Sequence, residues 1–383
     1  MENQSSQYLT RGKDYELKEQ LFTLPGKYYT SEDIYKEELD KIFYKRWILV
    51  GREEQIPHAG DYFLYNIENE SLIVTRDAGN KVNAHFNVCR HRGTRMCTES
   101  KGHFAGKSIQ CPYHAWTYNL KGELAGAPLM NELKQFDKKN YSLHSAKVQT
   151  WEGFIFINMD ENPTPFEKEF APLIGKWTDR KFPELRIAHT IEYNLKCNWK
   201  LILQNYQECY HCPGVHPLLA ELTPFRGASH DCMHGGILGG FMNITKEGGS
   251  MTMNGEAAGP ALPGVAGNEK QRIYYYSIYP NMLLTPHPDF VLYHVITPKG
   301  PHNVQLMCNW LFRPEVINDP NYKESIDSAI KFWDLTNQQD WQVCEQMQLG
   351  VGSKKFGTGH YSGMEDVLSE IDKETLRSLG HSI

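Results

Sequence analysis

The sequence predicts an α+β protein in which a small all-β unit precedes a larger unit of mixed helices and strands. Between residues 45 and 160, short runs of β-branched and aromatic side chains are separated by turn residues, a pattern typical of strands. After residue 160, helix-like and strand-like runs occur without the regular alternation of a parallel sheet. We therefore expect an N-terminal helical segment over residues 1–44, an all-β domain over 45–160 and an α+β domain over 161–383.

The elements of the first part are marked by caps and turns. A helix is expected from about residue 30 to 45, because Ser31 can cap it and acidic residues precede basic ones along it. The Asn-Pro-Thr-Pro sequence at residues 162–165 ends the all-β unit. The strands expected before it cover residues 61–66, 71–75, 82–88 and 153–158.

The larger unit has its own pattern. Strand-like runs cover residues 273–279 and 290–296, and residues 325–350 have the period of a long helix. Residues 246–268 are rich in Gly, Ala and Met without a period, which is typical of either a mobile lid or a long surface loop.

Composition excludes several classes of protein. A net charge of −6 provides no basic surface for nucleic acid. A mean hydropathy of −0.54 and the lack of a long apolar run argue against a membrane span. The N-terminal sequence has no apolar region of the kind found in secretory signals. The nine cysteines form no dense framework, so we expect reduced thiols in a cytoplasmic protein.

The most specific motif pairs Cys89-Arg90-His91 with Cys111-Pro112-Tyr113-His114. Two thiolates on one iron and two imidazoles on the other are the ligands of a Rieske [2Fe–2S] cluster, which carries one electron at a time. A structural zinc site also uses two Cys and two His, but a zinc finger groups its cysteines together and its histidines together. Because each half-site here mixes the two residue types, the spacing favours the cluster.

A second metal site is predicted from residues 205–216, NYQECYHCPGVH. Helical spacing before this motif predicts that Glu208 and His211 share one face of a helix. Pro213 and Gly214 are expected to break that helix, so that His216 can turn back towards His211. Two imidazoles with one carboxylate bind non-haem Fe(II) and leave positions open for dioxygen.

Other interpretations of this motif remain open. The two histidines are also typical of ordinary helix ends. Cys209 and Cys212 offer a zinc-like alternative, but these cysteines and His211 are crowded together, and we expect the cysteines to be packing residues.

Together the motifs CRHRG, CPYHAWTY and NYQECYHCPGVH resemble those of Rieske non-haem iron oxygenases of the α-subunit type, the ring-hydroxylating dioxygenase family. The resemblance covers about residues 30–350. Respiratory Rieske proteins fit less well, because Thr94 stands where their extra disulfide would begin. The resemblance implies cluster and mononuclear-iron ligands at these positions: Cys89 and Cys111 on one iron, His91 and His114 on the other, and His211 and His216 on the mononuclear iron.

The resemblance also assigns roles to neighbouring residues. Asn205 would lie close to the mononuclear iron, and Glu208 would be hydrogen-bonded to a cluster histidine of the neighbouring subunit. Glutamate at 208 is similar to the group acting on quaternary ammonium compounds, such as glycine betaine, carnitine and stachydrine oxygenases. The third iron ligand would be Asp340, although this chain has Gln339 where the family often has Glu.

Rival acids to Asp340 lie on the same predicted helix. Asp334 and Glu345 are carboxylates of that helix, and all three acids are also typical of a solvated helix face.

A fold, an activity and partners follow from the resemblance. The catalytic domain would have a helix-grip, START-like α+β fold, with the N-terminal segment packed on it. The protein would use dioxygen and electrons from NAD(P)H, passed through a separate flavin and iron–sulfur reductase, to hydroxylate a C–H bond of a small molecule. A homotrimer is implied, with electrons crossing between subunits through His114 and Glu208. No nucleic-acid or membrane partner is expected.

The substrate class is less constrained. We expect N-methyl oxidation and demethylation of a quaternary ammonium compound, with hydroxylation of an aromatic ring as the alternative. A non-catalytic iron–sulfur electron-transfer protein and a zinc-stabilised structural protein are alternatives of other classes. An aromatic cage would suit a cation, and at most half of the candidates can face one pocket because strand residues alternate: Tyr274, Tyr275, Tyr276, Tyr279, Phe290 and Tyr293.

Overall fold

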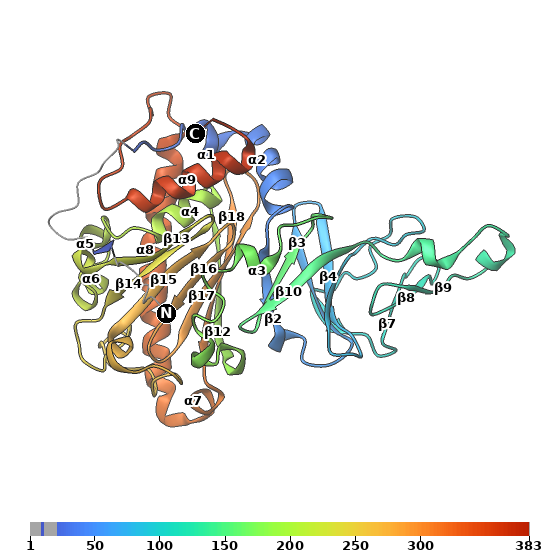
Figure 1. Ribbon diagram of the computed structural model, residues 1–383, viewed down its shortest axis with the longest axis horizontal. Helices are drawn as coiled ribbons and strands as arrows, with labels where there is room; N and C mark the ends of the chain where they lie inside the picture. Colours follow the sequence, from blue (N-terminus) through green and yellow to red (C-terminus); the bar gives the residue numbers. More distant parts are fainter. Residues whose placement is uncertain (1–8, 11–20, 383) are drawn as a thin grey trace, which may run out of the picture. The chain divides into compact units, whose positions relative to one another are not determined.

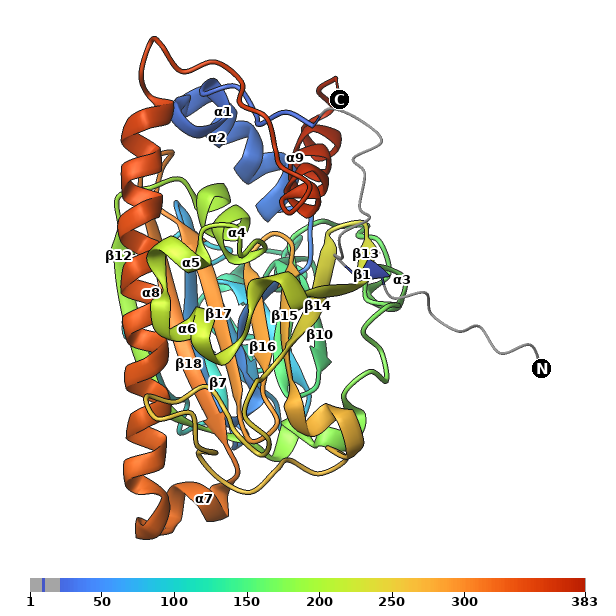
Figure 2. The ribbon, with the colours of Figure 1, turned by 90° about the vertical axis from the view of Figure 1, so that its left-hand side faces the viewer.

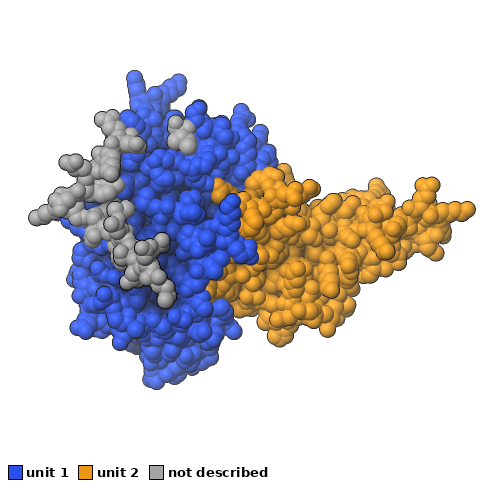
Figure 3. Space-filling model, viewed as in Figure 1, with its two compact units in different colours: residues 1–43, 167–383 blue, residues 44–166 orange. Residues whose placement is uncertain are grey.

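The computed structural model describes residues 9–10 and 21–382, and the chain divides into two compact units (Figure 3). The smaller unit covers residues 44–166, and the larger unit combines residues 1–43 with 167–383. Of the expected N-terminal segment, residues 1–8 and 11–20 lie outside the described residues. No helix among the described residues is both long enough and apolar enough to cross a membrane.

The smaller unit is built from two antiparallel sheets. A three-stranded sheet contains β7 (Ser108–Gln110), β8 (Thr117–Asn119) and β9 (Leu124–Gly126). The seven-stranded sheet has the order β2 (Ile48–Arg52), β11 (Phe154–Asn158), β10 (Ser145–Trp151), β5 (Val82–Phe86), β4 (Glu70–Arg76), β3 (Asp61–Ile67) and β6 (Lys101–His103).

The expected strand over 82–88 ends two residues early. Asn87 stops it, because its side-chain oxygen accepts hydrogen bonds from the backbone N–H groups of Met96 and Cys97 at 2.8 and 3.0 Å. The chain leaves the sheet there and forms the loop that carries Cys89 and His91.

The larger unit contains an eight-stranded antiparallel sheet (Figures 1 and 2). Its order is β1 (Leu9–Thr10), β13 (Ser229–His234), β14 (Ile237–Asn243), β15 (Arg272–Ile278), β16 (Met282–Pro286), β17 (Val291–Pro298), β18 (Val304–Phe312) and β12 (Arg186–Leu195).

Helices cover one face of this sheet. The long helix α8 runs along the sheet, and α4, α5 and α6 lie on the same side (Figure 2). Every third or fourth residue of α8 is buried, including Ala329, Phe332 and Trp333, so the helix expected over 325–350 is held by an apolar stripe. The helices are α1 (Lys27–Thr30), α2 (Glu32–Glu38), α3 (Phe166–Glu169), α4 (Trp199–Tyr206), α5 (Cys212–Val215), α6 (Pro217–Leu222), α7 (Pro314–Asn318), α8 (Lys323–Val351) and α9 (Asp366–Leu379).

The N-terminal helix is anchored to α4. Ser31 caps α2 by accepting a hydrogen bond from the Ile34 N–H, and a π-helical turn continues it to Phe43, so the expected helix ends before residue 45. Glu38 is buried and accepts hydrogen bonds from Trp199 Nε1 at 2.8 Å and Lys200 Nζ at 2.5 Å. A buried charge needs such a partner, and the pair fixes the helix that leads to the second motif.

The segment over 246–268 is a packed loop. Met251 and Ala258 are fully buried. Asp289 holds the loop by accepting hydrogen bonds from Ser250 Oγ and from the Ala258 N–H, each at 2.6 Å.

Candidate metal centres and substrate cavity

The first candidate centre lies on two loops of the smaller unit. Cys89 and His91 lie between β5 and β6, and Cys111 and His114 lie between β7 and β8. Each loop is a tight turn: the Cys89 carbonyl accepts from the Gly93 N–H at 3.0 Å, and the Cys111 carbonyl accepts from the Ala115 N–H at 3.1 Å. Gly93 has a φ of 75°, which favours glycine.

On both loops the proposed cysteine ligands are buried and the proposed histidine ligands are exposed. Cys89 and Cys111 are 2% and 3% exposed and their thiols contact each other, whereas His91 and His114 are exposed with ring centroids 4.8 Å apart. Burial, with the Cys89 thiol beside it, raises the pKa of the Cys111 thiol. Two buried thiols beside two exposed imidazoles fit a cluster with one all-sulfur side and one histidine side.

The second motif folds differently from the sequence expectation. Helix α4 ends at Tyr206, so the Glu208–His211 pair is brought together by a turn and not by a helix face. Pro213 does not break a helix: it lies in the first turn of α5, where its missing N–H costs nothing. His216 follows α5 directly and is 1% exposed.

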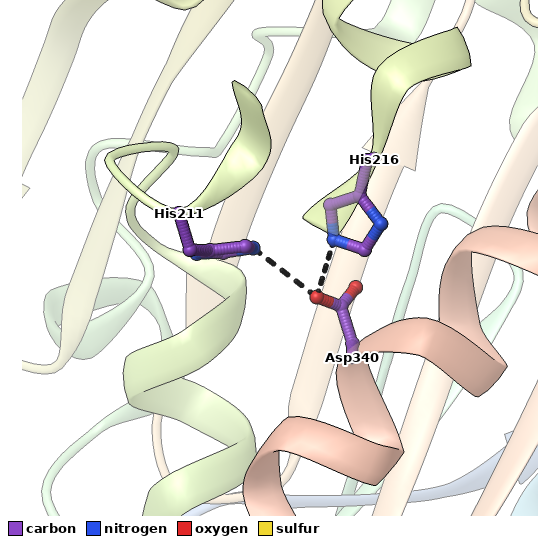
Figure 4. A group of neighbouring side chains, drawn as sticks. All are labelled: His211, His216 and Asp340. Carbon is purple, nitrogen blue, oxygen red and sulfur yellow. Dashed lines mark hydrogen bonds and ion pairs between the residues drawn. The ribbon is translucent and has the colours of Figure 1, made fainter. Parts of the chain in front are cut away.

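His211, His216 and Asp340 form a compact group (Figure 4). Asp340 Oδ1 lies 2.7 Å from His216 Nε2 and 3.2 Å from His211 Nε2. One ligand atom from each residue lies within 4.8 Å of the others. Two imidazole nitrogens and one carboxylate facing a common point are the donor set of a non-haem Fe(II) site with open positions.

The charge of this group also suits a cation. Burial opposes ionisation of Asp340, but hydrogen bonds with His211 and His216 outweigh it and lower the pKa of the carboxyl. Burial lowers the pKa of His211, whereas hydrogen bonds with Asp340 and Glu208 raise it to about 10. A divalent metal would replace that proton between the same three side chains.

Each histidine is oriented by a second side chain. His211 Nδ1 lies 2.5 Å from Glu208 Oε1, and His216 Nδ1 lies 2.8 Å from Gln339 Oε1. Since an oxygen acceptor at Nδ1 leaves Nε2 free, both histidines present the nitrogen that faces Asp340. The carboxamide of Gln339 therefore orients His216 in the same way as the carboxylate of Glu208 orients His211.

The rival acids are engaged elsewhere. Asp334 accepts a hydrogen bond from the Tyr193 hydroxyl at 2.7 Å, and Glu345 accepts one from the Lys196 N–H at 2.8 Å. Of the acids on α8 that we considered, only Asp340 reaches the two histidines.

Cys209 and Cys212 pack against the apolar core as expected, but the expectation that their thiols are reduced is wrong. The two residues are joined by a disulfide. The turn after α4 brings their Cα atoms to 4.9 Å, within the range that a disulfide spans. The zinc-like alternative for this pair is thereby also removed, since these sulfurs are bonded to each other.

A cavity opens beside His211, His216 and Asp340. It encloses about 790 Å³ of space between atoms, part of it open to solvent. Asn205 lines it and is 6% exposed, and its side-chain oxygen has no hydrogen-bond partner among the described residues. A second cavity meets the same motif from another side, because Asn205, Glu208 and His211 line both cavities.

Only one of the six candidate cage residues lines the first cavity. Tyr275 does so, because it points to the opposite face of β15 from Tyr274 and Tyr276. The rings of Tyr274 and Tyr276 instead surround the Lys176 ammonium, at 5.7 and 5.4 Å from their centroids. The other three candidates are buried elsewhere: Tyr279, Phe290 and Tyr293.

Other aromatic residues complete the cavity, and none was found from the sequence. Tyr206, Phe241, Trp333 and Trp341 come from α4, β14 and α8. The position of Trp341 directly after Asp340 was the one available signal. The others depend on which strands and helices meet.

Comparison with known families covers both units. Residues 46–137 match the Rieske [2Fe-2S] domain. Residues 182–380, just over half of the chain, match the ring hydroxylating alpha subunit (catalytic domain).

Relatives of the chain include oxygenase subunits of monooxygenases. The glycine betaine monooxygenase oxygenase subunit of Pseudomonas aeruginosa is 28% identical, over 94% of this chain and 90% of that protein. The carnitine monooxygenase oxygenase subunit of Acinetobacter baumannii is 36% identical, over 52% of this chain and 54% of that protein. A solved quaternary ammonium Rieske monooxygenase in complex with its substrate L-carnitine has a TM-score of 0.77 at 25% identity, covering 94% of this chain and 96% of that one.

Proposed function

The chain belongs to the family of ring-hydroxylating oxygenase α-subunits, and we propose that it oxidises an N-methyl group of a quaternary ammonium compound. The observation that carries this proposal is the group His211, His216 and Asp340 beside a cavity lined by aromatic rings. Aromatic faces attract methylammonium cations. The named activities of the relatives support the same substrate class.

The proposed reaction balances as a monooxygenation. One oxygen atom of dioxygen enters a C–H bond of the N-methyl group, and the other leaves as water. NAD(P)H supplies two electrons through a separate reductase, with one proton taken from solvent. The hydroxymethyl ammonium product then breaks its C–N bond, releasing formaldehyde and a protonated tertiary amine. Because NAD(P)H is an intracellular reductant, we place the enzyme in the cytoplasm.

Both metal groups fit the residues assigned to them. We propose Cys89, His91, Cys111 and His114 for the cluster, which supplies single electrons, and His211, His216 and Asp340 for the iron, which supplies dioxygen chemistry. Glu208 and Gln339 hold the two imidazoles with Nε2 towards Asp340. The aromatic side chains keep the cation beside this group.

The electron route is proposed to cross between subunits of a homotrimer. His91 and His114 are exposed on the smaller unit, so a partner can approach them directly. Glu208 lies between the two cavities and contacts His211. We therefore assign Glu208 as the side chain that links an incoming His114 of another subunit to the mononuclear site.

Formaldehyde release tests this function. Protein reduced with dithionite under anaerobic conditions would be mixed with dioxygen and with glycine betaine, L-carnitine, choline or benzoate. We expect formaldehyde from at least one quaternary ammonium compound, and none from Asp340→Ala protein. Hydroxylated benzoate without formaldehyde would replace the proposal with aromatic hydroxylation. Cluster oxidation without any product would favour an electron-transfer protein.

A further inference from the structure

The cavity beside His211, His216 and Asp340 divides its polar atoms into two sets. In the first set, the protein itself uses the polar atom and only the ring faces the cavity. The Tyr206 hydroxyl contacts Thr285 Oγ1 at 2.7 Å and donates to the Leu284 carbonyl at 3.0 Å. Trp333 Nε1 donates to His287 Nε2 at 2.9 Å. These side chains offer a ligand nothing but aromatic surface.

In the second set, the polar atoms are buried and are not used by the hydrogen bonds of the protein itself. Within the part of the chain that the structure describes, neither ring nitrogen of His294 makes a hydrogen bond of ordinary length and angle, although the Asn337 amide lies nearby. The Tyr275 hydroxyl is likewise buried without such a bond, although Thr223 lies nearby. His294 is only 1% exposed. Leaving a buried polar group unpaired is destabilising, so these atoms are suited to a group that enters the cavity.

The charges around the cavity restrict that group. Of the described residues that line it, two are carboxylates, Glu208 and Asp340, and none is Lys or Arg. A ligand carboxylate would be buried beside these acids without a Lys or Arg to pair with it, and burying an unpaired charge is costly. A ligand cation, in contrast, meets the faces of Phe241, Trp333 and Trp341.

We propose that His294 and Tyr275 determine substrate specificity by binding an uncharged hydroxyl group, so that the preferred substrate is a methylammonium cation that carries a hydroxyl and no carboxylate. Burial lowers the pKa of His294 to about 4, so its imidazole is neutral and offers one donor and one acceptor. A hydroxyl both donates and accepts and therefore matches it, whereas a carboxylate only accepts. This inference rests on the proposed function.

The preference separates the chain from two of the activities that its relatives are named for and agrees with a third. Glycine betaine and carnitine both carry a carboxylate, whereas the choline monooxygenase of Beta vulgaris, 27% identical over 90% of this chain, is named for a cation with a hydroxyl and no carboxylate. The cavity described here would bind glycine betaine and carnitine through the methylammonium end alone.

Binding of three related quaternary ammonium compounds tests the inference. Isothermal titration of the anaerobic holoenzyme would compare choline with ethyltrimethylammonium, which lacks only the hydroxyl, and with glycine betaine. We expect choline to bind about tenfold more tightly than either, the effect of one hydrogen bond to a buried group. In His294→Leu and in Tyr275→Phe protein, the advantage of choline over ethyltrimethylammonium is expected to fall to within twofold.

A matched control and the contrary outcomes complete the test. Tyr206→Phe removes a hydroxyl that the protein already uses, and should leave the choline to ethyltrimethylammonium ratio unchanged. Tyr275→Phe keeps the inference testable if His294→Leu does not fold. Glycine betaine binding as tightly as choline, or a ratio unchanged in both variants, would overturn the inference and leave the proposed function standing. If none of the three compounds binds, the proposed function itself would be overturned.

Discussion

The two metal centres differ in how their ligands are gathered. All four proposed ligands of the cluster site lie within residues 89–114, on neighbouring loops of one small unit. The mononuclear site combines His211 and His216 with Asp340, which is 124 residues beyond His216 and lies on another helix. A site made by adjacent loops can be recognised from spacing, whereas a site made by distant segments exists only when the whole unit has folded.

The centres also differ in exposure. The proposed cluster site buries its thiols and exposes His91 and His114, which suits the proposed electron route through the imidazoles. The mononuclear site buries His216 and opens to a cavity. The first arrangement is suited to contact with another protein, and the second to chemistry sheltered from bulk water.

Removing the distant carboxylate should have the largest effect. Asp340→Ala takes away the oxygen that lies between both imidazoles, so we expect one iron per chain to be lost and product formation to fall to background. The cluster absorption should persist, because its ligands lie in the other unit. Metal analysis and the visible spectrum check both points. Glu345→Ala, on the same helix, is the control; loss of iron in that protein as well would mean that α8 has been disrupted.

Removing a cluster thiolate should give the reciprocal result. Cys111→Ser is expected to lose two irons and the visible spectrum while keeping the mononuclear iron, so reductase-driven activity should disappear. Iron and sulfide analysis measures this. Cys97→Ser is the matched control, since Cys97 is buried in the same apolar cluster but is not among the proposed ligands. A Cys111→Ser protein that kept its spectrum would contradict the assignment.

Neutralising the linking acid should weaken the connection between the centres. Glu208→Gln can still accept the hydrogen bond from His211 Nδ1, so both metals should stay bound. Product formed per electron transferred should fall by about 10- to 100-fold, as for other residues that support metal ligands. Stopped-flow oxidation of the cluster counts the electrons transferred and gives the rate of their transfer, against which product formation is compared. Loss of the mononuclear iron in this variant would show that Glu208 is a ligand.

The smallest effect should come from the amide that orients His216. Gln339→Leu removes the acceptor at Nδ1 and should weaken mononuclear metal binding by about tenfold. Titration of metal-depleted protein with Co²⁺ measures the affinity. Gln338→Leu, whose amide contacts Asp334 instead, should bind Co²⁺ as the unchanged protein does. Equal affinities in both variants would show that Gln339 does not tune the site.

Much of this organisation could be predicted from the sequence. The family, the α+β fold and the oxygenase function were expected and are confirmed. The cluster ligands were proposed from spacing alone, because both half-sites are local. Asp340 was proposed only through the resemblance, since three acids of α8 were equivalent in sequence. The individual ligand roles stay predictions.

Other features depended on long-range structure. Gln339 could not be linked to His216, and Cys209 could not be paired with Cys212, without the turn after α4 and the packing of α8. Of the cage candidates only Tyr275 lines the cavity, in keeping with the expectation of at most half, and the sequence could not show which one it would be. Consecutive tyrosines of β15 face opposite sides of the sheet, and the sequence did not show that Lys176 occupies the side of Tyr274 and Tyr276.

The most direct test is whether the electron stored in one centre is used at the other. Fully reduced protein would be mixed with dioxygen and a substrate found by formaldehyde release, and cluster oxidation would be followed by its absorbance. We expect rapid oxidation that matches product formation in the unchanged protein, and at most slow oxidation without product in Asp340→Ala. Oxidation at the same rate in both proteins would show that the cluster does not deliver its electron to the centre formed by His211, His216 and Asp340.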